Sequence, residues 1–369
     1  MSELNASLNR INSIIRESSL AARGKSISKR RKRDETKPSA SWISESLIGT
    51  EIGKSLAIVL NTIGCSHARS DSGGCTMCSY LLDGSNSAIT PFQLQQQFDY
   101  AYNALEGLEK PLSIKIYTSG SFLDIEEVPV ESRDYILRRI AEDNRITEVV
   151  LESRPEYITK EAVRSVRSIL GDKRIEFGVG LESINDEVRQ ICINKGFSNE
   201  DFINSLELAR TENIGIRAYV LLKPPFLTER DAILDTKETI RSAAKNGVTT
   251  ISINPVNVQK NTLVEYLWKR DLYRPPWLWS LVDILIESRE NIPRSVNIVC
   301  DPVAGGKPRG IHNCGSCDKI IIQAIRDFSL SQDSSRLSKI TCSCRDSWQL
   351  SLIHDDITMQ SNRELTIDY

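Results

Sequence analysis

The sequence predicts an α/β fold built on a parallel sheet. Six short apolar runs follow one another between residues 55 and 255, and each is too short to form a helix of ordinary length. Longer amphipathic stretches separate these runs. Because strands that alternate with helices usually pair in parallel, this order indicates one sheet covered by helices. Roughly 200 residues suit either an open doubly wound sheet or a partial barrel, and periodicity does not choose between the two.

The predicted strands are rich in Val, Ile, Leu and Tyr. They cover residues 55–62, 113–119, 146–153, 175–183, 216–223 and 249–255. Helices are predicted between them, over residues 91–108, 131–143, 158–170 and 228–247. The last of these helices ends in Asn-Gly, a common helix stop. Residues 273–288 indicate a further amphipathic helix that begins after a pair of prolines.

The composition is that of an ordinary globular protein, with 40% hydrophobic and 26% charged residues among 369. No apolar run approaches the ~18 residues of a membrane span, and the polar N-terminus lacks the apolar core of a signal peptide. We therefore expect a cytoplasmic protein with no membrane partner. In a reducing compartment, nine cysteines favour metal ligation over disulfides.

Positive charge is concentrated in the first 40 residues, which contain ten Lys or Arg against four Asp or Glu in a chain whose net charge is −2. Residues 29–33 are all cationic. Such a run can bind a phosphate backbone by releasing counterions. It can equally be a solvated, disordered tail. The sequence leaves both interpretations open.

Three cysteines fall within the fourteen residues CSHARSDSGGCTMC, soon after the first predicted strand. Cys65, Cys75 and Cys78 are spaced C-x9-C-x2-C, at the strand end where parallel sheets place their sites. Three thiolates can hold zinc with His67 as a fourth ligand, or three irons of a 4Fe–4S cluster. A three-cysteine cluster would leave one iron open to a substrate, as catalytic zinc sites leave one position open. A structural zinc knuckle is the alternative.

This loop resembles that of the radical S-adenosylmethionine (SAM) superfamily. There, three cysteines after the first strand of a partial barrel hold a 4Fe–4S cluster, and the fourth iron binds the amino and carboxylate groups of SAM. The usual spacing is C-x3-C-x2-C, and the longer first gap here resembles the elongator-type branch. The resemblance implies a partial (β/α)6 barrel. An aromatic residue often precedes the last cysteine. Here that position is Met77, which can still cover an adenine face, and Tyr80 is an alternative cover.

Polar residues at the later strand ends match places where the superfamily binds SAM. Ser119, Gly120 and Ser121 resemble the segment whose backbone accepts the SAM amino group, although a tight turn is the simpler interpretation. Glu152 and Arg154 share a face after the third strand. A carboxylate there suits ribose hydroxyls and a guanidinium suits the SAM carboxylate, whereas the alternative is an ion pair that caps the sheet.

The remaining strand ends supply further candidates. Glu182 occupies the matching place after the fourth strand, as another cofactor-binding candidate. Lys223 follows the fifth strand, and Asn254 and Asn257 follow the sixth, as candidate substrate-binding residues. Alternatively, the lysine extends from the sheet edge into solvent and the asparagines bond only their own turn.

A second group of cysteines lies near the C-terminus. Cys314, Cys317, Cys342 and Cys344 form the pattern C-x2-C-x24-C-x-C, which suits a closed, structural zinc site. The same ligands can also hold a second iron–sulfur cluster, and we favour zinc. Cys192 stands alone in a helical stretch and is expected to be a buried structural thiol.

Five segments together are similar to the radical SAM component of archaeosine synthase: GCSHARSDSGGCTMCSY, YTSGSFLD, ESRPE, RPPWLWS and HNCGSCDKIIIQAIRDFSLSQD. In that family, a tRNA first receives a lysine adduct on a nitrile-bearing deazaguanine. The radical enzyme then cleaves a C–N bond of the lysine and leaves archaeosine. The resemblance implies a lyase-type enzyme that acts on tRNA and works with a partner transferase subunit and an electron donor.

These observations divide the chain into four predicted parts. They are a basic N-terminal tail (1–46), a radical SAM partial barrel (47–258), a helical connection (259–299) and a four-cysteine, zinc-binding region (300–369). Two other functions stay open at this point. One is a different radical SAM tRNA-modifying enzyme, of a methylthio- or acetyl-transferring type. The other is a non-catalytic, zinc-bearing RNA-binding protein.

Overall fold

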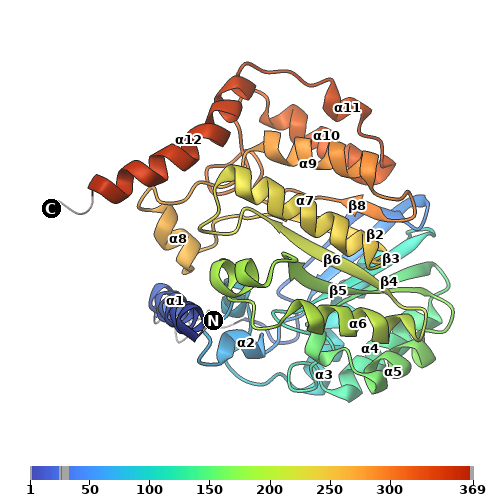
Figure 1. Ribbon diagram of the computed structural model, residues 1–369. Helices are drawn as coiled ribbons and strands as arrows, with labels where there is room; N and C mark the ends of the chain where they lie inside the picture. Colours follow the sequence, from blue (N-terminus) through green and yellow to red (C-terminus); the bar gives the residue numbers. More distant parts are fainter. Residues whose placement is uncertain (1, 25, 27–32, 366–369) are drawn as a thin grey trace.

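The computed structural model describes residues 2–24, 26 and 33–365. Its centre is one eight-stranded sheet in the order β1 to β8, so strands that follow one another in sequence lie side by side. The sheet curls into a half-barrel with helices on its outer face (Figure 1). This confirms the predicted partial barrel. An open doubly wound sheet is excluded, because its strand order reverses at a switch point.

β1 and β2 form an antiparallel hairpin, and every later pair of neighbours is parallel. The strands are β1 (Ala40–Ile48), β2 (Glu51–Val59), β3 (Leu112–Tyr117), β4 (Ile146–Glu152), β5 (Arg174–Glu182), β6 (Gly215–Leu222), β7 (Thr250–Pro255) and β8 (Asn297–Val299). All six predicted strands are present. The first one begins earlier and ends earlier than predicted, at Val59, so Asn61 and Thr62 belong to the loop that follows. Strands β1 and β8 were not predicted.

The longer helices between the strands cover the outer face of the sheet (Figure 1). The helices of the described residues follow one another in sequence order. They are α1 (Ser2–Arg23), α2 (Ser66–Arg69), α3 (Pro91–Tyr102), α4 (Val130–Glu142), α5 (Lys160–Leu170), α6 (Asn199–Arg210), α7 (Glu229–Lys245), α8 (Leu263–Trp268), α9 (Leu278–Asn291), α10 (Asp318–Ser331), α11 (Ser335–Ser338) and α12 (Cys344–Leu365). Several begin at a Ser or Thr whose side chain accepts a backbone N–H of the first turn; Thr90 and Ser198 do so within capping boxes. Among the described residues, no helix is both long enough and apolar enough to cross a membrane.

The two faces of the sheet differ in polarity. Ile116 and Phe177 are fully buried on the outer face, where the helices pack. On the concave face, Lys115 of β3 and Glu176 of β5 lie in one row across the strands. Parallel strands that are buried on both sides are apolar throughout, so this alternation indicates a polar interior. The half-barrel therefore encloses groups that can meet a polar ligand.

Buried charges occupy the amino-terminal half of this interior. Arg217 Nη2 lies 2.8 Å from Glu176 Oε2 and 3.9 Å from Glu148 Oε1. Although burial alone would raise it, Arg217 holds the pKa of Glu176 down at about 2. Lys115 Nζ donates a hydrogen bond to Ser46 Oγ at 2.8 Å, which ties β3 to the hairpin strand β1. These buried charges and polar groups are therefore paired with one another at the amino-terminal half of the sheet. The side chains at the carboxyl ends of the strands are not part of this network.

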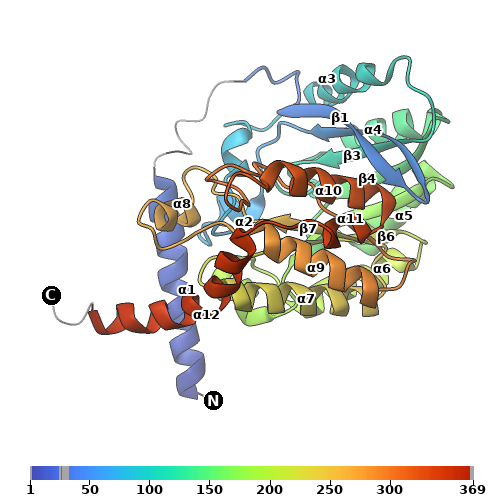
Figure 2. The same ribbon diagram turned by 90° about the horizontal axis from the view of Figure 1, so that it is seen from above.

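Helix α10 joins the two edges of the half-barrel, because it packs against both β8 and β1. Figure 2 shows α9, α10 and α11 together on this side of the molecule, whereas the later part of α12 extends away from the body. The apolar side chains of α10 that face the sheet, such as Ile321 and Phe328, are fully buried. The C-terminal region therefore packs into the same hydrophobic core as the barrel strands.

The segment before residue 47, expected to be a tail, contains helix α1 and strand β1. Residues 29–32 of the basic run lie outside the described residues. Arg33, the last member of the run, forms an ion pair with Asp83 at 2.7 Å. At the end of α1, Arg23 Nη1 donates a hydrogen bond to the Ala68 carbonyl at 3.0 Å. The N-terminal helix is thus attached to the loop that holds the three cysteines.

Candidate functional site

The three-cysteine loop lies at the carboxyl end of β2, as predicted. Cys65, Cys75 and Cys78 are all half-buried and free of disulfides. Burial and the neighbouring thiolates of Cys75 and Cys65 raise the pKa of Cys78 to about 12. The loop thiolates are therefore close enough to repel one another, and they share one electrostatic environment.

The loop after β5 fixes the outer side of the cysteine loop. The amide of Asn194 donates hydrogen bonds to the carbonyls of Ser72 and Gly74, at 2.7 and 2.8 Å. Thr76 bonds back to this segment, since its hydroxyl donates to the Cys192 carbonyl at 2.7 Å. Cys192 itself is buried, as expected of a structural thiol. These contacts join residues far apart in sequence, and motif spacing does not reveal them.

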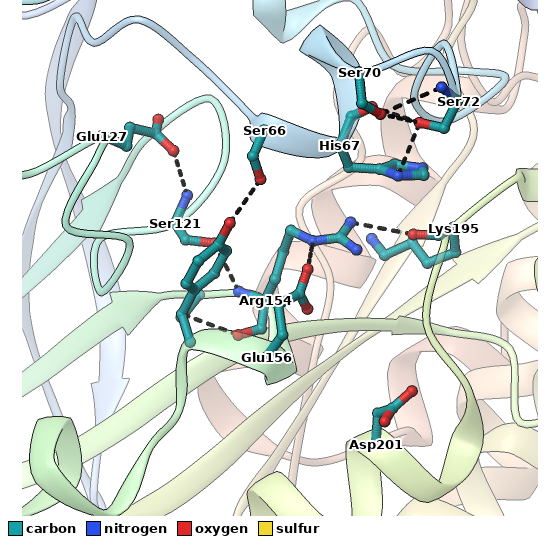
Figure 3. A network of polar contacts seen from close by, with 12 residues as sticks. Ser66, His67, Ser70, Ser72, Ser121, Glu127, Arg154, Glu156, Lys195 and Asp201 are labelled. Carbon is teal, nitrogen blue, oxygen red and sulfur yellow. Dashed lines mark hydrogen bonds and ion pairs between the residues drawn. The ribbon is translucent and has the colours of Figure 1, made fainter.

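His67 is a packing residue of this loop. Its Nε2 lies 2.7 Å from the Asn194 carbonyl oxygen and its Nδ1 lies 3.0 Å from Ser72 Oγ, so both ring nitrogens already have partners (Figure 3). Burial lowers its pKa to about 4. Gly196 packs directly against the ring, because a Cβ there would lie 2.5 Å from His67 Cε1. These contacts favour a packing role for His67 over the expected alternative, in which it is the fourth ligand of a zinc ion.

Glu127, which the sequence analysis missed, joins the cysteine loop to the loop after β3. Its carboxylate accepts hydrogen bonds from Thr62 Oγ1 at 2.5 Å, from the Gly120 N–H at 3.1 Å and from the Ser121 N–H at 2.7 Å. Figure 3 shows Glu127 directed toward Ser121. Burial raises the pKa of Glu127, and these donors oppose that effect. A lone Glu in a loop carries no sequence signal for such a role.

Gly120 is the point of closest approach between these two loops. A Cβ at this position would lie 2.6 Å from Cys65 Cα, which no side chain tolerates without movement of the backbone. The predicted small residues at this strand end therefore serve close packing on the cysteine loop. The Ser119 hydroxyl donates a hydrogen bond to the Tyr80 carbonyl at 3.0 Å, which adds a second tie between the loops.

Arg154 is held by three neighbours at the end of β4. Its Nε lies 2.5 Å from Glu156 Oε1, and its Nη1 donates to the Lys195 carbonyl at 3.1 Å (Figure 3). Its guanidinium also lies over the Phe197 ring. Burial lowers its pKa, but Glu156 and then the Cys65 thiolate raise it, and the net shift is upward. A fixed guanidinium thus lies within the electrostatic reach of the cysteine loop.

Glu152 and Glu182 end neighbouring strands, as predicted, but their surroundings differ. Glu182 forms an ion pair with Lys195, whose Nζ lies 2.6 Å from Glu182 Oε1. Burial raises the pKa of Glu152 to about 8, and Lys195 only partly offsets this shift. Lys195 also lies near the cysteine loop, and the charge of Cys75 helps to raise the pKa of Lys195. Sequence analysis missed Lys195 because it lies thirteen positions beyond its partner.

The substrate candidates lie in different surroundings. Lys223 is buried and forms an ion pair with Glu229 at 2.6 Å, so it does not extend into solvent. Asn254 and Asn257 are half-buried, and neither amide hydrogen-bonds another described residue. Of the two proposed adenine covers, Met77 packs against a small apolar cluster behind the loop, whereas Tyr80 is 50% exposed.

The four C-terminal cysteines come together. Their sulfur atoms all lie within 4.8 Å of one another, the only such set of three or more metal-ligand side chains among the described residues. The individual Sγ separations include 3.8 Å from Cys314 to Cys317 and 3.6 Å from Cys317 to Cys344. Trp279 Nε1 donates to Cys344 Sγ at 3.2 Å. Such outer donors are typical of bound thiolates, so the geometry is that of a four-cysteine metal site.

The three-cysteine loop fits an iron–sulfur cluster by its donor set. Its thiols are free and partly buried, and burial raises the pKa of Cys65 and Cys78, so these two thiolates are unfavourable unless positive charge compensates them. Bound iron would supply that charge. The loop sulfurs are spread more widely than the four C-terminal ones, and ligands of separate irons need not approach one another so closely.

No protein-family profile matches the chain. Three curated relatives match most of it. An uncharacterized protein of Methanocaldococcus jannaschii, MJ0550, is 41% identical over 344 residues, or 92% of this chain and 93% of the relative. The archaeosine synthase subunit beta of Methanosarcina acetivorans is 41% identical over 87% of this chain and 91% of its own. The same subunit of Thermococcus kodakarensis is 40% identical over 84% of this chain and 94% of its own.

Solved structures give partial likenesses. Elp3 of the archaeon Methanocaldococcus infernus superposes with a TM-score of 0.47 at 16% identity, over 66% of this chain and 60% of that one. Methylornithine synthase superposes with a TM-score of 0.42 at 10% identity, over 93% of this chain and 91% of that one.

The half-barrel, with a three-cysteine loop at the carboxyl end of its first parallel strand, is the arrangement that the resemblance to radical SAM proteins led us to expect. Within that class, identity of 40–41% over most of the length shows that the chain belongs to the archaeosine synthase subunit beta family.

Proposed function

We propose that this chain is a radical SAM enzyme of tRNA modification, which cleaves a C–N bond of a lysine adduct on a deazaguanine base to give archaeosine. One observation carries the proposal. Three free, half-buried cysteines lie on one loop at the carboxyl end of β2, in a chain that is 41% identical to an archaeosine synthase subunit beta over 87% of its length. The substrate and the lyase-type reaction rest on the family resemblance.

The proposed cofactor site is formed by side chains from successive strand ends. Cys65, Cys75 and Cys78 would hold the 4Fe–4S cluster. SAM would lie between the loop after β3 and the ends of β4 and β5, where the donors and acceptors of the structure converge. The proposed SAM-binding residues are Ser119, Gly120, Ser121, Glu152, Arg154, Glu182, Met77 and Tyr80. When bound, the cluster and SAM supply radical chemistry that removes a hydrogen atom from an unactivated carbon, here the carbon beside the lysine nitrogen.

The protein's own contribution is to hold the reactants in place and to exclude water. Glu127 fixes the β3 loop against Cys65, so the backbone of Ser119 to Ser121 has one defined position. Lys195 and Glu182 act as a pair, because either group alone would be a buried, uncompensated charge. Arg154 retains one guanidinium nitrogen, Nη2, without a partner among the described residues, and this nitrogen would face a carboxylate of SAM.

The remaining parts of the chain have proposed roles outside the chemistry. The four C-terminal cysteines would hold zinc, and this site joins the start of α10 to the start of α12. The basic segment before residue 47 and the zinc region after residue 300 would contact tRNA, mainly through phosphates. A partner transferase subunit would supply the lysine-adducted tRNA, and a separate electron donor would reduce the cluster. Lys223, Asn254 and Asn257 remain the proposed substrate contacts.

Anaerobic reconstitution with iron, sulfide, dithionite and SAM tests this function. We expect a brown protein that forms 5′-deoxyadenosine, faster in the presence of tRNA carrying the lysine-adducted base, together with archaeosine in that tRNA. The Cys75→Ala variant should lose the cluster and both products. Cys192→Ala, which changes a buried cysteine outside the loop, should retain them.

Three results would redirect the proposal. A colourless protein that binds only zinc and tRNA would indicate a non-catalytic RNA-binding protein. Sulfur or a methyl group gained by the tRNA would indicate a methylthio-transferring enzyme. Cleavage of SAM with no response to the adducted tRNA would indicate a different substrate.

A further inference from the structure

An aromatic pair lies at the β1 edge of the half-barrel. The rings of Trp42 in β1 and Tyr117 at the end of β3 are nearly parallel, with centroids 6.5 Å apart and an interplanar angle of 5°. Trp42 pairs with Ala57, which pairs with Lys115, so the indole shares the concave face with the polar interior. It is 48% exposed. The hydrophobic core lies on the other face, so packing does not account for a tryptophan here.

The pair lies next to the proposed cofactor site. In the register of the hairpin, Trp42 is two residues from the end where β1 meets Val59, the last residue of β2. Tyr117 is the last residue of β3, directly before the loop of Ser119 and Gly120. The stacked rings therefore lie beside the mouth into which the cysteine loop opens.

A second observation points to a missing partner deeper in the same interior. The hydroxyl of Tyr219 in β6 is buried and makes no hydrogen bond of ordinary geometry to the described residues. Gly178 of the neighbouring strand leaves the space for it, because a Cβ there would lie 2.5 Å from this oxygen. The Tyr117 phenol is its neighbour, but the two hydroxyls do not form a hydrogen bond of ordinary geometry. A buried hydroxyl with no well-formed hydrogen bond is costly, so a ligand that bonds it gains from the contact.

These groups surround one space. Besides burial, the charge of Glu152 raises the pKa of both Tyr117 and Tyr219, so the carboxylate lies near both phenols. The interior thus presents an exposed aromatic face at its edge, and a phenol and a carboxyl group further in. These surfaces fit a planar, polar ring system, because its face can stack on the aromatic side chain and its edge can bond the phenol and the carboxyl group. An aliphatic chain would fit neither.

We propose that Trp42 and Tyr117 form the platform on which the target base stacks after it flips out of the tRNA, with the base edge toward Tyr219. The choice of a nucleobase rests on the proposed function. Enzymes that act on a base within a folded nucleic acid extrude it and commonly hold it against aromatic side chains. Stacking supplies affinity for any base, while the polar groups beneath it select one.

Equilibrium binding of tRNA, without SAM or reductant, tests this platform. The probes are the tRNA with the lysine-adducted deazaguanine and the same tRNA with guanine at that position. Loss of one stacking contact weakens binding by about 5- to 150-fold, so we expect Trp42→Ala to raise the Kd for the adducted tRNA within that range. Trp42→Phe should recover most of the affinity. Phe92→Ala serves as the control, because Phe92 is also an exposed ring, 67% accessible, and lies on the outer helix α3.

The outcomes separate this inference from the proposed function. If Trp42→Ala binds both tRNAs within twofold of the unaltered protein while its circular dichroism is unchanged, the platform does not exist. A weaker affinity for SAM with unchanged tRNA binding would also overturn the inference, since Trp42 would then face the cofactor. If Trp42→Ala loses tRNA affinity and Trp42→Phe restores it, the platform stands even where no archaeosine is formed, and only the proposed reaction fails.

Discussion

Glu127 accepts a hydrogen bond from the Thr62 hydroxyl at 2.5 Å, and through this contact the loop after β3 is fixed to the loop after β2. The same carboxylate takes two backbone N–H groups of the β3 loop. This buried side chain therefore helps to set the position of the proposed SAM-binding segment relative to the cysteine loop, together with the hydrogen bond from Ser119 to the Tyr80 carbonyl.

Replacement of that carboxylate should destabilise both loops. In Glu127→Gln, the new NH2 group faces backbone N–H donors and cannot accept from them. We expect the free energy of unfolding to fall by about 1–3 kcal/mol, the usual result of leaving buried donors unpaired. Chemical denaturation measures the change. Glu126→Gln, one residue earlier and exposed, should stay within about 0.5 kcal/mol of the unaltered protein. Equal stabilities of the two variants would contradict the role of Glu127.

Gly120→Ala should separate the two loops by steric contact. The added methyl group would lie 2.6 Å from Cys65 Cα, so one of the backbones must move. We expect loss of iron after reconstitution and a lower melting temperature. Gly107→Ala is the matched control, because no atom lies within 4 Å of a Cβ there and only its positive φ of 75° resists substitution. That strain costs about 1 kcal/mol and should leave iron binding intact. Iron retained by Gly120→Ala would rule out the close approach.

The pair of Lys195 and Glu182 should show strong energetic coupling. Lys195→Met leaves Glu182 in a buried position without its partner at 2.6 Å. Breaking one side of such a pair costs about 3–5 kcal/mol. The double variant Lys195→Met/Glu182→Gln should be less destabilised than the sum of the single variants, as a double-mutant cycle measures. Additive effects would mean that the ion pair does not form in solution.

Glu152 should make stability depend on pH. Its pKa rises from 4.5 in the unfolded chain to about 8 in the folded protein. Between these values the folded state holds a proton that the unfolded state has released, so stability falls as the pH increases from about 4.5 to about 8. The slope contributed by this group is at most about 1.4 kcal/mol per pH unit.

Glu152→Gln should remove this contribution to the slope, as denaturation curves at several pH values would show. The charged or titratable groups that influence Glu152, or that it influences, are Lys195, Glu127, Glu182, Tyr80, Tyr117 and Tyr219. Glu126→Gln again provides the control, and its pH profile should follow that of the unaltered protein. Parallel profiles for Glu152→Gln and the unaltered protein would show that Glu152 is ionised at neutral pH.

The four-cysteine site should contribute stability through its metal. Cys317→Ser should release about one metal ion per chain and lower the melting temperature, because structural zinc supplies folding free energy directly. Elemental analysis identifies the metal. Cys300→Ala changes a buried cysteine outside this set and should leave the metal content unchanged. Iron in this position would identify a second cluster instead of zinc.

The order of strands and helices along the chain was predictable, because each of these elements is indicated by residues that are close together in the sequence. Each of the six predicted strands is a short apolar run between helical stretches, and the cysteine loop follows the first run directly. Strand β1 escaped prediction: six of its nine residues are exposed, so it lacks the pattern of a buried strand.

Residues of the site were predictable where a strand end places them. Cys65, Glu152 and Glu182 follow from that rule. Glu127 and Lys195 do not, since one lies in an irregular loop and the other follows a π-helix at Val188–Ile193. Their importance comes from contacts with distant segments, and a single sequence carries no periodic signal for such contacts.

The sequence by itself indicated six strands and their succession along the chain, a parallel sheet and two separate sets of cysteines, because hydrophobic periodicity and motif spacing act over a few neighbouring residues. Only the tertiary structure decided that His67 is a packing residue, that Lys195 neutralises Glu182 and that Trp42 faces the interior beside Tyr117. Each of these depends on the curl of the sheet, which brings side chains from distant strands into one small volume where burial and charge set their chemistry.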